Sequence, residues 1–413
     1  MTNAGILVLN AGSSSLKFAV FALSGDSDEG TVVLRGQISA IGSAALFRAW
    51  NRFRRSAAES ESRAVADLAT HQKAIEYALA WIGEKSDGMQ LIAVGHRVVH
   101  GGPERSASAL VSDALLHELD VLSLLAPHHQ PHNLAAIRAV RAVAPDLPQV
   151  ACFDTAFHAG QPEVARRLPL PAMYREMGLQ RYGFHGLSYE YITSVVAEHN
   201  AGQLPERLIV AHLGNGASLC AISGGRSIAT SMGFSTLDGL LMGTRSGSID
   251  PGVLLHLMRE EQMAEPDLSN LLYNQSGLLG VSGISSDMQV LLSSSERGAV
   301  EAVELFCYTL MRSIGSMAAA LQGVDGIVFT GGIGEHAAQI RQTVCENLAW
   351  LGVDFDVAAN TAGASLLTRA ASRVRVWVIP TDEERIIARH AVRVVRTASL
   401  AAGPAAEVEP PRD

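Results

Sequence analysis

The sequence contains few cysteines, and none of them forms a ligand pattern. Among its 413 residues there are four, all far apart in apolar surroundings and without a Cys-x-x-Cys pair: Cys152, Cys220, Cys307 and Cys345. Disulfide frameworks and zinc sites need paired or closely spaced cysteines. The pattern therefore predicts reduced thiols in the core of a cytoplasmic protein.

Excess positive charge and long apolar runs are also absent. The formal net charge is −9, which disfavours nucleic acid or an anionic membrane as the main partner. No apolar run approaches the roughly 18 residues of a membrane-spanning helix. The first residues carry no basic segment of the kind that begins a secretion signal. We therefore expect a cytoplasmic protein, with no nucleic acid and no membrane among its partners.

The common glycine-rich nucleotide motifs, GxxxxGK[ST] and a GxGxxG between strand and helix, are missing as well. A hairpin occurs twice instead, at residues 6–20 and 208–222: an apolar strand, a turn of Gly, Ser and Asn, and a second apolar strand. Turns of small residues expose backbone N–H groups to which phosphate binds; the alternative is two ordinary hairpins. The two copies, with Lys17 just after the first turn, favour a duplicated fold that binds one polyphosphate from both halves.

The order of the expected elements repeats along the chain. Its length suits two domains, and each half starts with three strands and continues with alternating helices and strands, which predicts an α/β duplication. The first half has strands at 6–9, 16–21, 32–38, 91–95 and 149–153, a polar stretch near 56–62, and helices at 64–82, 113–125 and 133–143. The second half has strands at 208–212, 219–223, 226–230, 326–330 and 374–379, and helices at 251–261, 301–322, 340–351 and 384–396.

Two arginines lie among glycines and apolar residues, Arg97 in the segment GHRVVHGG and Arg245 in MGTRSG. A guanidinium in such surroundings needs an anion, and its fork suits carboxylate or phosphoryl oxygens; a structural ion pair is the alternative. Asp154 follows an apolar strand, where acidic residues of α/β folds often face a site. His185 lies in a tight aromatic turn, where a histidine is more often structural.

Three further segments have open interpretations. Residues 331–334, Gly-Gly-Ile-Gly, form either a tight strand-to-helix turn or a close approach to a flat ligand such as adenine. Residues 382–384 form the acidic first turn of a helix, or one of their carboxylates joins Asn10 as an oxygen ligand of Mg²⁺. Residues 128–132 hold three histidines, but we expect the flanking prolines to prevent a helix there, which disfavours a metal site.

Together these stretches resemble the acetate kinases, of the superfamily that includes sugar kinases, Hsp70 and actin. Eight stretches in family order carry the resemblance: residues 10–17, 95–102, 153–158, 181–186, 212–218, 230–251, 329–335 and 380–389. It implies an α/β fold of two duplicated ribonuclease-H-like domains (βββαβαβα each), with the active-site cleft between them. It also implies reversible, Mg²⁺-dependent phosphoryl transfer from ATP to acetate, which yields acetyl phosphate and ADP.

The resemblance assigns roles to residues of this chain. Asn10 and Glu383 would coordinate Mg²⁺, for which Mn²⁺ can substitute, and Lys17 with the serines at 13–15 would meet phosphate. Arg97 would bind the acyl substrate, and Asp154 would orient or deprotonate it; because a carboxylic acid is already ionised at pH 7, we favour orientation. The transition state would be stabilised by His185 and Arg245, with His129 in the active-site wall. The nucleotide would be held by His212, Leu213, Gly214, Asn215, Gly216, Asp287, Met288, Gln289, Gly332, Ile333, Gly334, Glu335 and His336.

The chain departs from the family pattern around the nucleotide. Asp382 replaces the first residue of the usual Asn-Glu-Glu, Gln289 stands where arginine is common, and His336 stands where asparagine is usual. These changes leave the phosphoryl chemistry intact and leave the nucleotide preference open.

The acyl pocket differs as well. Val99 and Phe184 keep an apolar wall, whereas His128 and Thr236 occupy positions usually held by Leu and Pro. The nearest alternative is therefore a kinase of propionate or another short acid. A more distant one is an ATPase scaffold of the actin or Hsp70 type, which has no reason to keep a second anion site.

The resemblance also predicts the domain organisation and a homodimer. We expect an N-terminal domain of residues 1–153 plus 383–398, onto which the C-terminal helix folds back. Residues 154–382 would form the nucleotide-binding domain, and residues 399–413, rich in Ala, Pro and Glu, a disordered tail.

Overall fold

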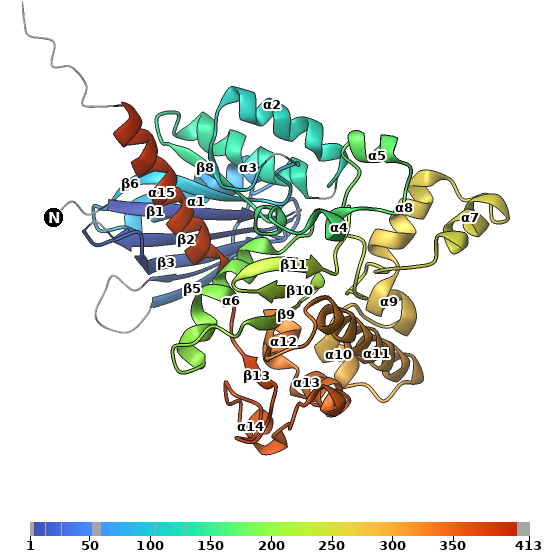
Figure 1. Cartoon of the computed structure of the whole chain (residues 1–413). Coiled ribbons are helices and arrows are strands. Elements are labelled where there is room, and N and C mark those ends of the chain that lie inside the picture. The colour runs from blue at the N-terminus through green and yellow to red at the C-terminus, as the bar shows by residue number, and fades with distance from the viewer. Residues whose placement is uncertain are drawn as a thin grey trace, which may run out of the picture. The chain divides into compact units, whose positions relative to one another are not determined.

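The chain divides into two compact units, each built on its own β-sheet (Figure 1). The computed structural model describes residues 4–12, 14–25, 27–51, 59–103, 105–127 and 129–402. Unit 1 comprises Met1–Gly101, Ala107–Ala156 and Glu383–Asp413, and unit 2 comprises Gly102–Ser106 and Phe157–Asp382. Asp154 thus belongs to unit 1, because it directly follows a strand of that unit's sheet.

The described residues of unit 1 form a mixed sheet of eight strands, in the order β5-β4-β3-β2-β1-β6-β8-β7. The strands are β1 (Ala4–Ala11), β2 (Leu16–Leu23), β3 (Gly30–Ser39), β4 (Leu46–Asn51), β5 (Glu59–Ala64), β6 (Gln90–Val98), β7 (Ala109–Leu110) and β8 (Gln149–Phe153). Neighbours from β1 to β5 are antiparallel, whereas β6 runs parallel to β1 and β8 parallel to β6. Because these three strands are parallel, their carboxyl ends lie at one edge of the sheet.

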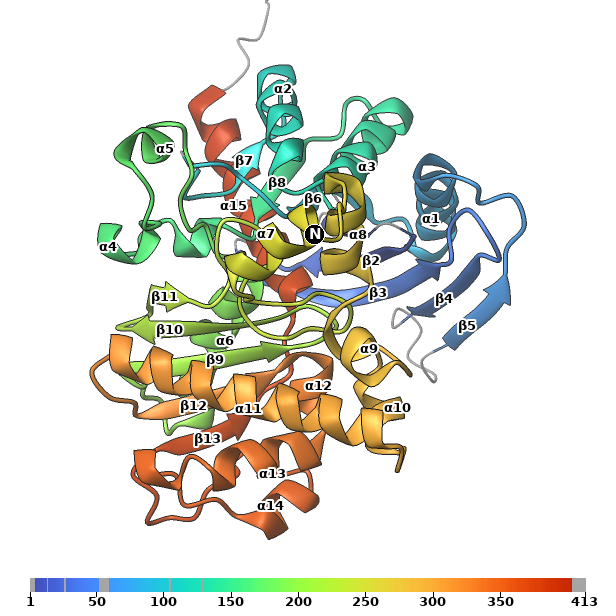
Figure 2. The same ribbon diagram turned by 90° about the vertical axis from the view of Figure 1, so that its right-hand side faces the viewer.

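Helices cover both faces of this sheet (Figure 2). They are α1 (His71–Lys85), α2 (Asp113–Val121), η1 (Leu122–Leu124), α3 (Gln130–Val143) and α15 (Glu383–Ala402). On one face α1 and α3 bury an apolar cluster that includes Leu9, Phe18 and Val94. On the other face α15 packs on β6, β1 and β8, and its Ile387 lies directly against Gly95, where a Cβ would clash. The last helix of the chain therefore completes the first unit.

Unit 2 repeats the arrangement of the central strands. Its sheet has the order β11-β10-β9-β12-β13, with β9 (Arg207–Leu213), β10 (Ala217–Ser223), β11 (Arg226–Thr230), β12 (Gly326–Thr330) and β13 (Arg375–Val378). The first three strands are antiparallel, and β12 and β13 run parallel to β9. The series β3-β2-β1-β6-β8 of unit 1 has the same order and directions. The predicted α/β fold of two mixed sheets is confirmed.

Helical segments fill the connections of unit 2. After η2 (Ala156–His158) they are α4 (Glu163–Arg166), α5 (Ala172–Glu176), α6 (Gly186–His199), α7 (Pro251–Arg259), α8 (Glu265–Asn274), α9 (Gly277–Ser282), α10 (Met288–Leu292), α11 (Arg297–Ala320), α12 (Gly331–His336), α13 (Ala338–Glu346), η3 (Ala349–Leu351) and α14 (Val357–Thr361). The long α11 packs against β9, β10 and β11. The glycine cluster at residues 331–334 is the first turn of α12, which starts immediately after β12.

Several expected boundaries were wrong in unit 1. The helix expected from residue 64 begins at His71, where Thr70 is the N-cap and its hydroxyl accepts a hydrogen bond from Lys73 N–H at 3.3 Å. The residues before it include β5, which pairs with β4, and neither strand was predicted. Pairing with a neighbouring strand overrides local polarity here, because the β5 sequence ESESRA has almost no apolar content.

The histidine run is partly helical, contrary to expectation. Residues from Gln130 onward form α3, with His129 as its N-cap and Pro131 in its first turn. Proline is compatible with a first turn because its missing N–H would have no intrahelical partner there. The His132 ring stacks 5.6 Å from that of His71. His128 lies outside the described residues.

The four cysteines are free and buried. Burial raises the pKa of Cys220 to about 12 and that of Cys307 to about 11, so both thiols stay protonated at neutral pH. At the C-terminus, α15 continues to Ala402, beyond the expected end of the domain at residue 398. The remainder of the expected tail lies outside the described residues.

Three buried histidines make the stability of the fold depend on pH. Burial lowers the pKa of His96, His100 and His158 from 6.5 to about 4. Each folded-state pKa lies below the unfolded value, so the unfolded chain takes up these protons first. The free energy of unfolding is therefore highest above pH 6.5 and falls as the pH drops toward 4. Each histidine should lower the free energy of unfolding by about 1.4 kcal/mol per pH unit in that window. Urea unfolding at several pH values measures the slope.

A matched pair of variants assigns this slope. His96→Gln should reduce the slope by the contribution of one proton, about 1.4 kcal/mol per pH unit. His199→Gln changes an exposed histidine and should leave it unaltered. A free energy of unfolding that is the same at pH 7 and pH 5 would contradict the prediction.

Candidate active site

Three predicted site residues of unit 1 lie at the carboxyl ends of its parallel strands. Asn10 is near the end of β1, Arg97 near the end of β6, and Asp154 directly after β8. The strands are neighbours in the order β1-β6-β8, and Asp154 N–H extends the ladder by donating to the Val98 carbonyl at 3.1 Å. In open α/β sheets this edge is where ligands bind.

Arg97 and Asp154 form a buried bidentate ion pair. Arg97 Nη2 donates to Asp154 Oδ2 at 2.7 Å and Nε donates to both carboxylate oxygens at 3.1 Å. On its other side, Arg97 Nη1 lies 3.4 Å from Glu383 Oε2 of α15. The Asp154 side chain is 1% exposed, whereas that of Arg97 is 19% exposed. The guanidinium is therefore held in place by the buried Asp154 carboxylate, and its exposed part can still be reached by a small anion.

Electrostatics keep this arginine charged. Burial alone would lower the pKa of Arg97, but the carboxylates of Asp154 and Glu383 raise it above its usual value. Burial raises the pKa of Asp154, and the charge of Arg97 opposes this increase. The result is a permanent cation whose position is set by a carboxylate that solvent hardly reaches.

Two amides of α3 that we did not predict hold the chain next to Arg97. Asn133 Oδ1 accepts from Val99 N–H at 3.1 Å, and its Nδ2 donates to the Ala11 carbonyl at 2.8 Å. Gln130 forms a pair of hydrogen bonds with the backbone of His100, at 3.1 and 2.9 Å. Both amides are buried. Asn133 thus connects the end of β1 to the end of β6.

Val99 is buried beside these groups, and His129 precedes Gln130 as the N-cap of α3. Lys17 pairs with Asn10 across the β1–β2 hairpin, and its side chain is exposed. Within the turn, Gly12 N–H donates to the Ser15 carbonyl at 2.8 Å. Ser13 lies outside the described residues.

In unit 2, two histidines stack at the second hairpin. The rings of His185 and His212 lie 4.3 Å apart with an interplanar angle of 22°. His185 Nδ1 hydrogen-bonds Ser218 Oγ and His212 Nδ1 hydrogen-bonds Ser188 Oγ, each at 2.8 Å. Because each Nδ1 has a hydroxyl partner, both rings are fixed in orientation. His185 is also the N-cap of α6, with an unusual positive φ of 59°.

Arg245 lies close to the same turn. Its Nη1 donates to the Thr236 carbonyl at 3.1 Å. A Cβ placed on Gly216 would lie 3.5 Å from His185 Nε2 and 3.7 Å from Arg245 Nη1, so both groups border this glycine. Gly243 N–H donates to the Asn215 carbonyl at 3.0 Å, which attaches the arginine loop to the turn. Unit 2 therefore brings His185 and Arg245 together beside the Gly214–Gly216 backbone.

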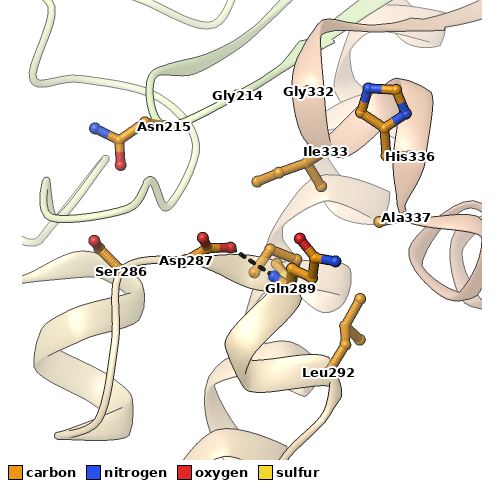
Figure 3. A pocket seen from close by; sticks show the side chains of 11 residues that line it. Gly214, Asn215, Ser286, Asp287, Gln289, Leu292, Gly332, Ile333, His336 and Ala337 are labelled. Atoms are coloured by element: carbon orange, nitrogen blue, oxygen red, sulfur yellow. Dashed lines mark hydrogen bonds between the residues drawn. The ribbon is translucent and has the colours of Figure 1, made fainter. Parts of the chain in front are cut away.

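A pocket of about 660 Å³ opens from this turn (Figure 3). The β9–β10 turn, the start of α10 and the first turn of α12 form its walls. Eight of the thirteen residues that the resemblance assigns to the nucleotide line it: Gly214, Asn215, Asp287, Met288, Gln289, Gly332, Ile333 and His336. Ser286, Leu292 and Ala337 line it as well and were not predicted. The size suits a nucleoside.

The other five residues do not line the pocket. Leu213 and Gly334 are buried, whereas His212 and Gly216 lie nearer to His185 and Arg245. Glu335 turns back on the backbone, where its Oε1 accepts from Gly331 N–H at 3.0 Å and from Thr381 N–H at 3.3 Å. Phe184, expected in the acyl wall, is buried in unit 2, whereas Val99 is in unit 1.

A sequence profile described as the acetokinase family matches residues 5–389. An acetate kinase of Rhodopseudomonas palustris is 47% identical over 400 residues, which cover 94% of this chain and 98% of that protein. The chain belongs to the acetokinase family. Among solved structures, Porphyromonas gingivalis acetate kinase aligns at TM-score 0.83 and 34% identity, covering 95% of this chain and all of that one. A propionate kinase of Francisella tularensis aligns at TM-score 0.87 and 33% identity with the same coverage.

The two candidate metal ligands, Asn10 and Glu383, both belong to unit 1. Val8 pairs with Gly95, which packs against Ile387 of α15. Because side chains alternate between faces along a strand, Asn10, two residues after Val8, points to the face of the sheet on which α15 packs, and Glu383 is the first residue of that helix. An amide oxygen and a carboxylate suit Mg²⁺, which commonly takes one or two protein oxygens and several waters. Within the described part of the chain, no group of three His, Cys, Asp or Glu residues is arranged for a metal.

The buried ion pair has a consequence for stability. Arg97→Ala would leave the Asp154 carboxylate uncompensated at 1% exposure, and breaking such a pair costs about 3–5 kcal/mol. Adding Asp154→Asn should restore part of the loss, because a neutral amide needs no counter-ion. Urea unfolding of the two single variants and the double variant measures this coupling.

The control is Arg138→Ala, which removes an ion pair between Arg138 Nη2 and Asp120 whose side chains are 48% and 46% exposed. This variant should change the free energy of unfolding by at most about 1 kcal/mol. Equal losses in Arg97→Ala and Arg138→Ala would mean that burial of Asp154 does not matter.

Proposed function

We propose that the chain catalyses the reversible transfer of the γ-phosphoryl group of ATP to acetate, giving acetyl phosphate and ADP. The observation that carries the proposal is the match to the acetokinase family over residues 5–389. The arginine held by Asp154 and Glu383 in unit 1 and the pocket of unit 2 supply the two binding functions that this reaction needs. The proposal requires both to act on one pair of substrates.

Arg97 is the acceptor-binding group. A carboxylate substrate matches a guanidinium that retains its charge and is 19% exposed. Asp154 acts on the substrate through Arg97, because both of its oxygens already accept hydrogen bonds from that side chain. Since acetate is ionised at neutral pH, no base is needed to activate it. Orientation rather than proton abstraction is therefore the role of Asp154.

ATP occupies the pocket of unit 2, with its base between α10 and α12 and its phosphates toward the Gly214–Gly216 turn. There His185 and Arg245 supply hydrogen-bond donors and positive charge. Phosphoryl transfer depends on positioning and on charge stabilisation of the transferred oxygens, with little covalent chemistry. His129 and Lys17, on unit 1, complete the set that the resemblance assigns.

Asn10 and Glu383 would hold the Mg²⁺ that accompanies ATP, and Mn²⁺ is expected to substitute. The ion, when bound, neutralises part of the charge on the phosphates. Glu383 would share its carboxylate between this ion and Arg97, which lies 3.4 Å away. The same residue would thereby connect nucleotide and acceptor.

Propionate is the second candidate acceptor. A specific observation favours keeping it: a solved propionate kinase aligns with this chain at TM-score 0.87. Thr236, at a position where the family usually has proline, is buried, and its carbonyl accepts the hydrogen bond from Arg245.

The homodimer and the cytoplasmic location stay predictions. In the described residues, no helix has the length and apolar content to cross a bilayer.

Acceptor choice is measured by coupled ADP release with acids of one to four carbons. Acetate should have the highest kcat/KM, exceeding propionate by about tenfold, the low end of what one methylene provides. Thr236→Pro should increase this ratio. Thr236→Val keeps the shape of the side chain and removes the hydroxyl, so a comparison of the two variants separates the effect of polarity from that of the rigid proline ring. A wild-type preference for propionate or butyrate would overturn the acetate assignment and leave the mechanism in place.

The nucleotide pocket is tested with Gly332→Leu. A Cβ on Gly332 meets no atom within 4 Å, so the new side chain enters open pocket space without disturbing the fold. The KM for ATP should rise at least about tenfold, a change of about 1.4 kcal/mol, while the KM for acetate stays constant. Gly160→Leu is the control, because this exposed glycine also has no atom near its Cβ position. An unchanged KM for ATP would place the nucleotide elsewhere.

A further inference from the structure

The face of the unit 1 sheet that carries α15 extends beyond that helix. One row of paired residues crosses it as Gly95, Val8, Ala19, Arg35 and Trp50 on β6, β1, β2, β3 and β4. The first three are buried, with Gly95 lying against α15. Arg35 is exposed and Trp50 half-buried. The sheet is therefore open on this face from β3 outward.

A second row of paired residues lies on the same face, two residues away along each strand, and all of its members are polar. It runs through Asn10, Lys17, Gln37, Arg48 and Ser62 on the five strands from β1 to β5. Lys17 and Arg48 are exposed. The row begins at the candidate metal ligand Asn10 and ends at the outer edge of the sheet.

The outer residues of the two rows line a depression of about 490 Å³, and three of them are cations, Lys17, Arg35 and Arg48. Arg35 on β3 is the diagonal neighbour of Lys17 on β2 and of Arg48 on β4, so the three positive charges repel one another in the free protein. The gathering is notable in a chain whose net charge is −9. An anion bound among the three would remove the repulsion.

Two acidic residues line the depression, but only Glu384 directs its carboxylate to this face. Glu61 on β5 points to the α1 face, where it accepts from Trp81 Nε1 at 3.4 Å and pairs with Lys85 at 3.3 Å. Glu384 of α15 lies 3.8 Å from Arg35 Nη2, in a pair whose side chains are 21% and 47% exposed. Neither neutralises Lys17 or Arg48.

We propose that this depression binds a small organic phosphate, separately from the substrates of the proposed reaction. The phosphoryl oxygens would meet Arg35 and Arg48, whose guanidinium donors suit phosphate, so that Lys17 stays available for the phosphates of the nucleotide. The flat or apolar part of the ligand would lie on Trp50, and the Gln37 amide adds a neutral donor. The volume lies within the range of small-molecule sites.

The ligand would also influence turnover through Glu384. Arg35, when bound to a phosphate, releases Glu384, the residue after Glu383 in the first turn of α15. Glu383 in turn lies 3.4 Å from Arg97 Nη1, so a movement in the first turn of α15 would reach Arg97. Occupation of the depression therefore changes the surroundings of the acceptor-binding arginine. This effect rests on the proposed function, whereas binding itself does not.

Phenyl phosphate and inorganic phosphate are the probes, measured by titration calorimetry on the full chain. Wild type should bind phenyl phosphate with a Kd below about 10 mM. Arg48→Glu should weaken binding at least about tenfold, and Arg48→Lys should retain most of it. Trp50→Ala should weaken binding of phenyl phosphate but not of inorganic phosphate. Lys73→Glu, an equal change of charge at an exposed position on α1, is the matched control and should bind as wild type does.

Kinetics separate the site from the substrates. Phenyl phosphate should change kcat/KM for acetate in wild type but not in Arg48→Glu, whose basal activity should be normal. Equal affinity in wild type and Arg48→Glu, or no binding to wild type, would overturn the site. Loss of phenyl phosphate binding when ADP saturates the protein would assign the depression to the nucleotide and refute a separate site. If Arg48→Glu does not fold, Arg48→Gln replaces it in both measurements.

Discussion

The ion pair between Arg97 and Asp154 is the interaction on which unit 1 depends. The Asp154 carboxylate is almost completely buried, and a buried charge without a counter-ion is strongly destabilising. The folded state of unit 1 therefore requires this pair. Because it joins the ends of β6 and β8 and receives Glu383 from α15, it connects three segments that are far apart in the chain. The arginine that we propose to bind the acceptor is thus also needed for the structure of unit 1.

The second unit reaches a similar result by different contacts. Its parallel strands again end at one edge, but the groups there are two stacked histidines and an arginine bordering a glycine turn. Gly216 has no side chain, which lets His185 and Arg245 come close to the backbone. The duplicated sheet therefore carries two unlike sets of groups, one of which we propose to bind a carboxylate and the other the phosphates of a nucleotide.

Much of this architecture was predictable from local patterns. The repeated hairpin and the alternation that follows it predicted two related α/β domains, and family membership and fold class are confirmed. The polar strand β5 was missed, because its residues carry no strand signal and pair only once β4 is beside them. The helical histidine segment was misjudged, because a proline in a first turn is harmless whereas one in a helix interior is not.

The sequence by itself determined the class of fold, the family and the chemical types of the site residues, since hydrophobic period, turn composition and motif spacing are local properties. The tertiary structure alone decided how these residues are used. It directed Glu335 to backbone amides rather than to the pocket, recruited Asn133 to connect two strand ends, and aligned Lys17 with Arg48 across the sheet. Each of these depends on register and packing between segments distant in sequence, which no local pattern encodes.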